Sequence, residues 1–382
     1  MKIGECYVGW ATDENVRNKG ASGGLVTATL AAALKSKLVD KVLVLKKISE
    51  YEAVPMHTNN IEEVMKTAGS LHSVPINLAK YITGMDDKTK VALPAKPCDA
   101  RAIIEQAKRN TINLDNTYII GLNCGGSMHP LVTREMLRQV YEINPEDVIG
   151  EEIAKGKLIF FTKDGEKAID IDQLEEKEYG RRVDCRYCNI KIPRNADLAC
   201  GNWGVIGDLV NKATFVEINT EKGITLLNNA IEAGFIEMEP ASEKGIAIRS
   251  KINSAMESLA KKWMDKIFVP IEGSHLQYYI NALENCINCG ACKAVCPVCS
   301  CGGDSKCLIF NFANDTYKIS MFHLIRFLHL SDSCIGCGQC TDVCPVDIPL
   351  AQIQRRFSNI IQPKYNYVPG MDLRIPPFLE VK

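Results

Sequence analysis

Apolar and polar residues follow two different periods along the first 275 positions. Runs of four or five apolar residues alternate with longer segments in which apolar residues recur every three or four positions. The short runs predict strands at residues 41–45, 90–93, 118–122, 158–162 and 214–218. The longer segments predict helices at residues 20–36, 61–66, 74–82, 97–109, 131–141, 221–233 and 242–265. This alternation favours a mixed α/β domain with a sizeable core.

The pattern changes after residue 275. A short helix is expected at residues 276–284, and a longer one at residues 317–330, where apolar residues again have helical spacing. The last twenty residues are rich in proline and aromatic residues and predict an extended tail. We therefore expect three parts, with boundaries at residues 1–275, 276–360 and 361–382.

Two cysteine runs flank the predicted helix at residues 317–330, and they share one spacing. Each reads C-x2-C-x2-C-x3-C-P, the first from Cys286 to Pro297 and the second from Cys334 to Pro345. This spacing is typical of bacterial ferredoxins with two [4Fe–4S] clusters, in which the fourth cysteine of each run binds the other run's cluster. It predicts two ligand sets: Cys286, Cys289, Cys292 and Cys344 for one cluster, and Cys334, Cys337, Cys340 and Cys296 for the other.

Zinc and disulfides are the alternatives for such cysteines. Zinc sites usually take two ligands from each run rather than four. The first residues, MKIGECYVGW, lack the apolar segment of a signal peptide, and the most apolar stretch, residues 25–34, is too short to span a bilayer. We therefore expect a soluble, cytoplasmic protein in which the 17 cysteines serve metal or redox chemistry rather than disulfides.

The charge balance excludes two classes of partner. The 45 lysines and arginines nearly cancel the 46 aspartates and glutamates, and no long run of either sign occurs. Nothing in this balance points to a basic surface of the kind that binds nucleic acid or an anionic membrane. We expect no nucleic-acid partner and no membrane span.

Four further cysteines lie in settings that suit a third cluster. Cys98 starts a predicted helix, where free amides and the helix dipole favour a thiolate. Cys124 ends a predicted strand and precedes two glycines, while Cys185 and Cys188 form a CxxC in a loop. A lone CxxC also suits zinc or a redox disulfide. Linear spacing does not show that the four converge, and Cys200 competes as a ligand.

Several short motifs occur in one order along residues 1–240. They are Gly20-Ala-Ser22-Gly23-Gly24 with Thr27, Pro97-Cys98, Asn-Cys124-Gly, Cys185-x2-Cys188 and Asp197-x3-Gly201-Asn202. In this order they resemble the coenzyme F420 hydrogenase/dehydrogenase β-subunit family. The resemblance implies an α/β flavin-binding domain, here followed by a mainly α-helical ferredoxin domain with two clusters.

The resemblance also implies cofactors and site residues. It implies bound FAD, a [4Fe–4S] cluster on Cys98, Cys124, Cys185 and Cys188, hence three [4Fe–4S] clusters in all, and hydride exchange with coenzyme F420, a deazaflavin. The implied flavin contacts are Gly20, Ser22, Gly23, Gly24, Thr27, Gly69, Ser70 and Asn202. A glycine-rich turn before a helix suits a phosphate, although the spacing is not that of a Rossmann fingerprint. No side chain is expected to act as acid or base, because FAD itself converts single electrons into hydride.

The C-terminal position of the expected ferredoxin domain indicates one branch of this family. A C-terminal dicluster domain is similar to that of the formate-dehydrogenase branch of the family. This implies an iron–sulfur flavoprotein subunit that passes electrons from formate oxidation to coenzyme F420. The expected partner is a catalytic α subunit with a molybdenum or tungsten pterin, with a larger heterodisulfide-reductase-type complex as a further partner. The alternatives are a hydrogenase-type β subunit and a flavin-free electron-transfer adaptor.

Other cysteines and histidines have ordinary interpretations. Cys299, Cys301 and Cys307 leave a tetrahedral site one ligand short, and we expect spare thiols. His323 and His329 are six positions apart, on different faces of the predicted helix, and are expected to be packing or surface groups.

Three basic residues flank the expected flavin and cluster segments. They are Lys19, Lys96 and Arg101. Each either meets a phosphate or the acidic tail of the deazaflavin, or is simply solvated.

Overall fold

The computed structural model describes residues 1–301, 316–374 and 377, with only the backbone for residues 316–320. The chain divides into two compact units. Unit 1 comprises residues 1–76, 86–97 and 115–259, and unit 2 comprises residues 77–85, 98–114 and 260–382. Two segments from the middle of the N-terminal half therefore pack with the C-terminal part, which the change of sequence pattern at residue 275 does not indicate.

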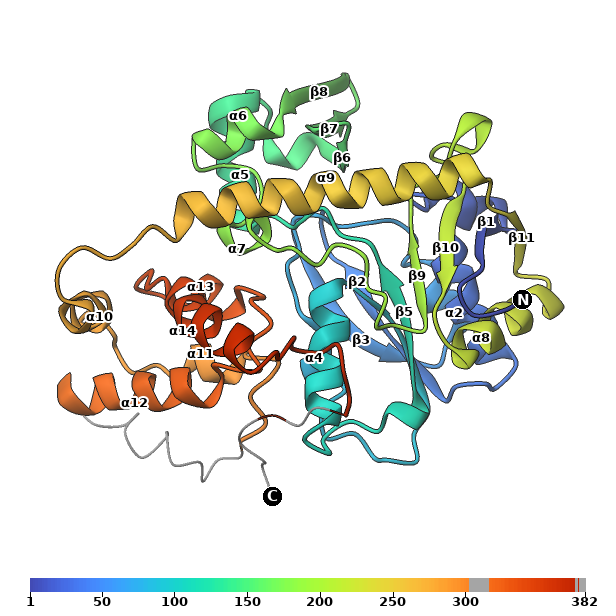
Figure 1. The fold of residues 1–382 in the computed structure, drawn as a ribbon. Helices are drawn as coiled ribbons and strands as arrows, with labels where there is room; N and C mark the ends of the chain where they lie inside the picture. Colours follow the sequence, from blue (N-terminus) through green and yellow to red (C-terminus); the bar gives the residue numbers. More distant parts are fainter. Residues whose placement is uncertain (302–315, 375–376, 378–382) are drawn as a thin grey trace. The chain divides into compact units, whose positions relative to one another are not determined.

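Unit 1 is built on an eight-stranded mixed sheet with the strand order β11-β1-β10-β9-β5-β4-β2-β3 (Figure 1). Strands β2, β4, β5 and β9 run parallel, while β3 at one edge and β10, β1 and β11 toward the other are antiparallel to their neighbours. The bounds are β1 (Cys6–Ala11), β2 (Lys41–Lys47), β3 (Ala53–Thr58), β4 (Val91–Ala95), β5 (Thr117–Leu122), β9 (Leu198–Gly201), β10 (Thr214–Ile218) and β11 (Ile236–Pro240).

Helix α2 (Leu25–Lys35) forms the centre of the main core. Its buried positions include a run of alanines, 31–33, and these small side chains allow close packing against the sheet and α8. The other helices of unit 1 are α1 (Glu14–Lys19), α3 (Ile61–Met65), α5 (Pro130–Met136), α6 (Ile171–Glu176), α7 (Val183–Arg186), α8 (Glu221–Glu232) and the first part of α9 (Glu243–Ile267). Short 3-10 or π turns lie at Leu114–Asn116, Leu137–Tyr141, Pro145–Asp147 and Gly207–Leu209.

A second, three-stranded antiparallel sheet belongs to unit 1 and has its own core. It consists of β6 (Val148–Ala154), β7 (Lys157–Thr162) and β8 (Gly165–Asp170). Tyr141 and Phe160 meet edge to face in this core, with ring centroids 4.9 Å apart.

A buried carboxylate ties this small sheet to the loop after residue 70. Glu151 of β6 is 8% exposed and accepts hydrogen bonds from the Ser73 N–H and hydroxyl, both at 2.7 Å, and from the His72 N–H at 2.5 Å. Burial raises the pKa of Glu151 from its ordinary value of 4.5 to about 7, although these hydrogen bonds act in the opposite direction.

Glu151 is expected to make unit 1 less stable as the pH rises. The folded state holds the proton more tightly than the unfolded chain does, so the stabilising contribution is complete below pH 4.5 and is lost as the pH rises through about 7. The difference between the two pKa values corresponds to roughly 3 kcal/mol in the free energy of unfolding. Urea unfolding at pH 5 and pH 7.5 should show a smaller difference for Glu151→Gln than for wild type. Glu152→Gln, one position along the same strand, is the control, and equal pH dependence in both variants would refute the assignment.

Unit 2 is mainly helical. Its helices are α4 (Pro97–Ala107), α10 (His275–Leu283), α11 (Ala291–Ala294), α12 (Thr316–His329), α13 (Gln339–Asp342) and α14 (Leu350–Lys364), with a 3-10 turn at Leu78–Tyr81. Phe322 and Phe327 of α12 pack with Ile348, Leu350 and Ile353 to form its core.

Most expected elements are present in the described residues, but two expectations are wrong. Residues 20–24 form a turn rather than the start of a helix, because Gly23 and Gly24 adopt positive φ angles of 72° and 69°. Residues 74–82 contain only the 3-10 turn at Leu78–Tyr81. Among the described helices, none combines the length and the apolar character that a membrane span needs.

Candidate metal centres

The two C-terminal cysteine runs adopt equivalent backbone conformations. In both, the residues on either side of the second cysteine have positive φ angles: Asn288 (58°) and Gly290 (71°), then Gly336 (68°) and Gly338 (77°). Each loop then enters a one-turn helix, α11 or α13. Left-handed backbone favours glycine and tolerates asparagine, which explains the residue types at these positions.

Each run also contributes one cysteine to the cavity of the other run. Cys286, Cys289 and Cys292 line one cavity together with Cys344. A second cavity is lined by Cys334, Cys337, Cys340 and Cys296. The structure thus gathers the same two sets of four that the ferredoxin spacing predicts.

Backbone amides point at sulfur atoms in both sets. The Gly336 N–H donates to Cys334 Sγ at 3.4 Å, and the Ile348 N–H donates to Cys344 Sγ at 3.4 Å. Four thiols with amide donors beside them fit the ligand shell of a [4Fe–4S] cluster. No three His, Cys, Asp or Glu side chains within the described ranges are arranged to bind a single metal ion.

Helix α12 brings two buried polar side chains to these cavities. His323 Nε2 lies 3.2 Å from Cys286 Sγ, and Arg326 donates from Nη2 to the Cys292 carbonyl oxygen at 2.9 Å. His323 was expected to be an ordinary packing or surface group, but it directly contacts a predicted ligand, whereas His329 lies half-buried without such a contact among the described residues. The sequence feature that points to a polar role for this helix is Arg326, a charged residue inside an otherwise largely apolar helix.

The extra cysteines after the first run are only partly described. A hydrogen bond from Cys301 lowers the pKa of Cys299 to about 5, against the effect of burial. Lys80 donates to the Cys299 carbonyl oxygen at 3.2 Å, and Lys293 donates to that of Cys301 at 3.3 Å. Cys307 lies outside the described residues, so the expectation of spare thiols stays a prediction.

Three of the N-terminal cysteines belong to unit 1: Cys124 and Cys188 lie in loops, whereas Cys185 lies in the short helix α7 rather than in the expected loop. Burial raises the pKa of Cys124 to about 11, and the charge of Cys185 adds to this while buried Lys191 opposes it. Lys191 donates to the Cys185 carbonyl oxygen at 3.3 Å, and Arg182 Nη1 lies 3.7 Å from Cys185 Sγ. Basic groups beside thiols stabilise thiolates, so the donors suit an anionic cluster. Cys188 Sγ contacts the Ile190 carbonyl oxygen at 3.5 Å.

The loop after Cys124 packs closely against Arg181 and Cys185. A Cβ on Gly126 would lie 2.7 Å from Arg181 Cδ and 3.2 Å from Cys185 Cβ. Arg181 in turn forms a buried ion pair with Glu175 and donates to the Gly125 carbonyl oxygen at 3.1 Å. These contacts hold the loop of Cys124 beside helix α7, which carries Cys185.

Cys98 and Cys200 are the remaining two cysteines of interest. Cys98 opens α4 and belongs to unit 2, where its charge contributes to raising the pKa of Cys337. Cys200 is wholly buried in the main core, and burial raises its pKa to about 12. Cys124 is shifted in the same direction by burial, so the competition of Cys200 as a ligand stays a prediction.

The glycine-rich turn before α2 is crowded. A Cβ on Gly20 would lie 2.4 Å from the Gly24 nitrogen, and one on Gly23 would lie 2.1 Å from the Lys212 carbonyl oxygen. Packing alone therefore requires glycine at both positions. Gly24 caps α2 without a side-chain hydrogen bond, which leaves the first N–H groups of the helix for an anionic ligand such as phosphate.

The other implied flavin residues are placed around this turn or on the surface. A Cβ on Gly69 would lie 3.3 Å from the Lys19 carbonyl oxygen, so the segment of Gly69 and Ser70 adjoins the turn. Thr27 and Ser22 are half-buried, and Ser70 is exposed. Asn202 is exposed in a tight turn closed by the Val205 N–H at 3.2 Å.

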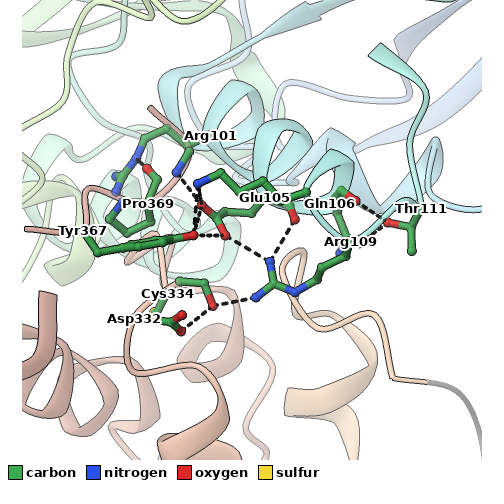
Figure 2. A network of polar contacts seen from close by, with 12 residues as sticks. Arg101, Glu105, Gln106, Arg109, Thr111, Asp332, Cys334, Tyr367 and Pro369 are labelled. Carbon is green, nitrogen blue, oxygen red and sulfur yellow. Dashed lines mark hydrogen bonds and ion pairs between the residues drawn. The ribbon is translucent and has the colours of Figure 1, made fainter. Parts of the chain in front are cut away.

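Arg101 and Lys96 have protein partners. Arg101 is buried in unit 2, where it donates to the carbonyl oxygens of Pro369 at 2.8 Å (Figure 2) and Ile335 at 3.0 Å, so the solvated alternative is wrong for this residue. Lys96 donates to the Ile76 carbonyl oxygen at 2.7 Å. Lys19 stays exposed.

A buried carboxylate fastens the tail to α4, as Figure 2 shows. Glu105 is fully buried and accepts hydrogen bonds from the Tyr367 hydroxyl at 2.9 Å and the Gly370 N–H at 2.7 Å. It also pairs with Lys108 at 2.9 Å and Arg109 at 3.0 Å.

Helix α4 and the turn that follows it are joined to both cysteine runs. Arg109 donates to Ser333 Oγ at 2.8 Å, beside the second run, and Gln106 donates to the Pro297 carbonyl oxygen at 2.7 Å, at the end of the first. Helix α4, the tail and the two cluster loops therefore form one polar framework within unit 2.

An α/β domain joined to paired four-cysteine cavities defines the class of iron–sulfur electron-transfer proteins. Three family models match the chain in succession. They are "Coenzyme F420 hydrogenase/dehydrogenase, beta subunit N-term" at residues 6–83, its C-terminal counterpart at residues 88–244 and "4Fe-4S dicluster domain" at residues 285–348.

More particularly, the chain belongs to the coenzyme F420 hydrogenase/dehydrogenase β-subunit family, whose members are oxidoreductase subunits. It is 43% identical over 385 residues to F420-dependent formate dehydrogenase 1 subunit beta of Methanococcus maripaludis, with 98% of this chain and 97% of that protein covered. It is 45% identical over 378 residues to F420-dependent formate dehydrogenase subunit beta of Methanocaldococcus jannaschii, with 97% and 98% covered.

A solved structure shares the fold. A chain of the F420-reducing [NiFe] hydrogenase complex from Methanosarcina barkeri superposes with a TM-score of 0.59 at 19% identity, covering 69% of this chain and 93% of that chain. At this identity the likeness shows the fold alone.

Proposed function

We propose that the chain is the β subunit of an F420-dependent formate dehydrogenase and passes electrons between a catalytic partner subunit and coenzyme F420. The observation that carries the proposal is the extent of the match to subunits of that name, which takes in 98% and 97% of this chain, ferredoxin part included. The β subunit of a coenzyme F420 hydrogenase from Methanococcus voltae aligns with only 59% of the chain, at 27% identity.

Three clusters are proposed to form the electron path. Two would be held in unit 2 by the cysteine sets that line its cavities, and a third by Cys98, Cys124, Cys185 and Cys188. Such clusters supply one-electron transfer when bound. In each unit 2 set a backbone N–H donates to one of the sulfurs, from Gly336 or from Ile348, and the apolar side chains of Phe327 and Leu330 line the cavity of Cys334, Cys337, Cys340 and Cys296.

FAD is proposed to bind at the glycine-rich turn. When bound, FAD converts between single electrons and the hydride that a deazaflavin exchanges. The uncapped N-terminus of α2 would receive a phosphate, and the adjoining Gly69 and Ser70 would contact the same cofactor. Gly20, Ser22, Gly23, Gly24, Thr27 and Asn202 complete the proposed set. The side chains of the chain orient the cofactor and need not transfer a proton.

Formate oxidation is proposed to occur in a separate α subunit with a molybdenum or tungsten pterin. Anaerobic purification of the complex from the producing cells, with mass spectrometry of the subunits and metal analysis, tests this directly. We expect a molybdenum- or tungsten-containing companion. A nickel-containing companion would assign the chain to a hydrogenase, and three clusters without any flavin would make it an electron-transfer adaptor. A heterodisulfide-reductase-type assembly would appear as additional subunits.

A further inference from the structure

Helix α12 presents a histidine and an arginine to the two cysteine cavities of unit 2. His323 and Arg326 are three positions apart and therefore lie on one side of the helix. His323 reaches Cys286 Sγ of one cavity, whereas Arg326 binds the Cys292 carbonyl oxygen of that cavity and lines the other. One helix thus supplies N–H groups to both sites.

Arg326 is an unusual residue to bury. It is 4% exposed, and within the described residues its Nε has no hydrogen-bond partner. A buried cation costs several kcal/mol unless opposite charge compensates it. Burial alone would lower the pKa of Arg326, but the charges of Cys292, Cys296 and Cys340 outweigh this and raise it. Cys292 belongs to one predicted ligand set, whereas Cys296 and Cys340 belong to the other, whose cavity Arg326 lines.

His323 contacts the cysteine set of one cavity, that of Cys286. It is 1% exposed, its Nε2 lies 3.2 Å from Cys286 Sγ, and within the described part of the chain its Nδ1 is buried without a hydrogen-bond partner. A thiolate sulfur only accepts hydrogen bonds, so with iron bound to Cys286 the proton of a neutral imidazole belongs on Nε2. The Nε2–H would then donate to Cys286 Sγ.

We propose that Arg326 and His323 are positioning residues that set the reduction potentials of the two unit 2 clusters, Arg326 acting on both and His323 on the cluster of Cys286 alone. The proposal rests on the proposed clusters. Reduction adds one negative charge to a cluster, and a fixed positive charge or an N–H donor beside its sulfurs stabilises that charge. Both residues therefore raise the potential, and their loss lowers it.

The test is an EPR-monitored redox titration of the anaerobically purified full-length protein. Arg326→Gln should lower both potentials, each by at least the 59 mV that corresponds to a tenfold change in the ratio of reduced to oxidised cluster. Arg326→Lys keeps the charge and should shift them less. His323→Phe should lower only the potential of the cluster of Cys286, and His323→Gln, which keeps an N–H donor, should restore part of it. The EPR signals are assigned with Cys289→Ala and Cys337→Ala.

The matched control is Arg374→Gln, which removes the same charge from a side chain that is 89% exposed, and it should leave both potentials unchanged. Wild-type potentials in Arg326→Gln at full iron content would overturn the role of Arg326, and equal shifts of both clusters in His323→Phe would overturn the local role of His323. If Arg326→Gln does not assemble its clusters, the potentials of Arg326→Lys, His323→Phe and His323→Gln still test the proposal. Absence of both clusters from wild-type protein would instead overturn the proposed function.

Discussion

Cys296→Ala is expected to remove the cluster whose other three ligands lie in the second cysteine run, although Cys296 itself belongs to the first. Cys344→Ala should likewise remove the cluster of the first run. The reason is the crossed arrangement in unit 2, where Cys296 lines the cavity of Cys334, Cys337 and Cys340. Each variant should lose about four irons per chain, measured by iron analysis, and one EPR signal. Electron transfer through the chain should fall below detection.

Double variants make this expectation sharper. Cys296→Ala combined with Cys337→Ala should lose no more iron than either single variant, because both cysteines serve one cluster. Cys296→Ala combined with Cys289→Ala should lose about eight irons, because two clusters are affected. The reverse pattern would show that each run binds its own cluster.

Glu105→Ala is expected to destabilise unit 2 by about 3–5 kcal/mol, because it leaves two buried cations without their carboxylate. Lys108 and Arg109 both pair with Glu105, and their side chains are almost completely buried. The tail also loses the acceptor of the Tyr367 hydroxyl and the Gly370 N–H. Guanidinium unfolding of the anaerobic protein, followed by loss of cluster absorbance, measures the change.

Two further variants, one inside this network and one outside it, provide the comparison for this loss. Tyr367→Phe removes one hydroxyl donor and leaves the ion pairs intact, so it should cost about 1 kcal/mol. Asp372→Ala breaks an ion pair with the exposed Arg374 on the same tail and should leave the unfolding midpoint unchanged. An unfolding midpoint of Glu105→Ala equal to that of Asp372→Ala would show that the buried network does not hold the tail.

Local patterns made much of the fold predictable. The helices at Glu221–Glu232 and Glu243–Ile267 follow from apolar positions at helical spacing. The two groups of four cysteines follow from the runs themselves, since three ligands come from one short loop. By contrast, strand β8 (Gly165–Asp170) is exposed along most of its length and therefore has no alternation of apolar and polar residues to reveal it.

Features that depend on distant parts of the chain were not predictable. Glu105 and Tyr367 are 262 positions apart, so no local pattern indicates that α4 belongs with the ferredoxin part. His323 has its partner 37 positions away, and only the fold brings it to Cys286. The family resemblance interprets the glycines of the turn before α2 as cofactor contacts, whereas the backbone contacts of Gly20 and Gly23 also require glycine there.

The central claim is that electrons held on iron–sulfur clusters leave this chain as hydride on a deazaflavin. The most direct measurement is reduction of coenzyme F420 by the anaerobically purified, FAD-loaded protein with reduced viologen as electron donor, together with its iron and flavin content. We expect about twelve irons and one FAD per chain, and F420 reduction that stops when FAD is removed. Protein with about four irons or fewer and no flavin absorbance, or FAD-loaded protein that leaves F420 oxidised, would contradict it.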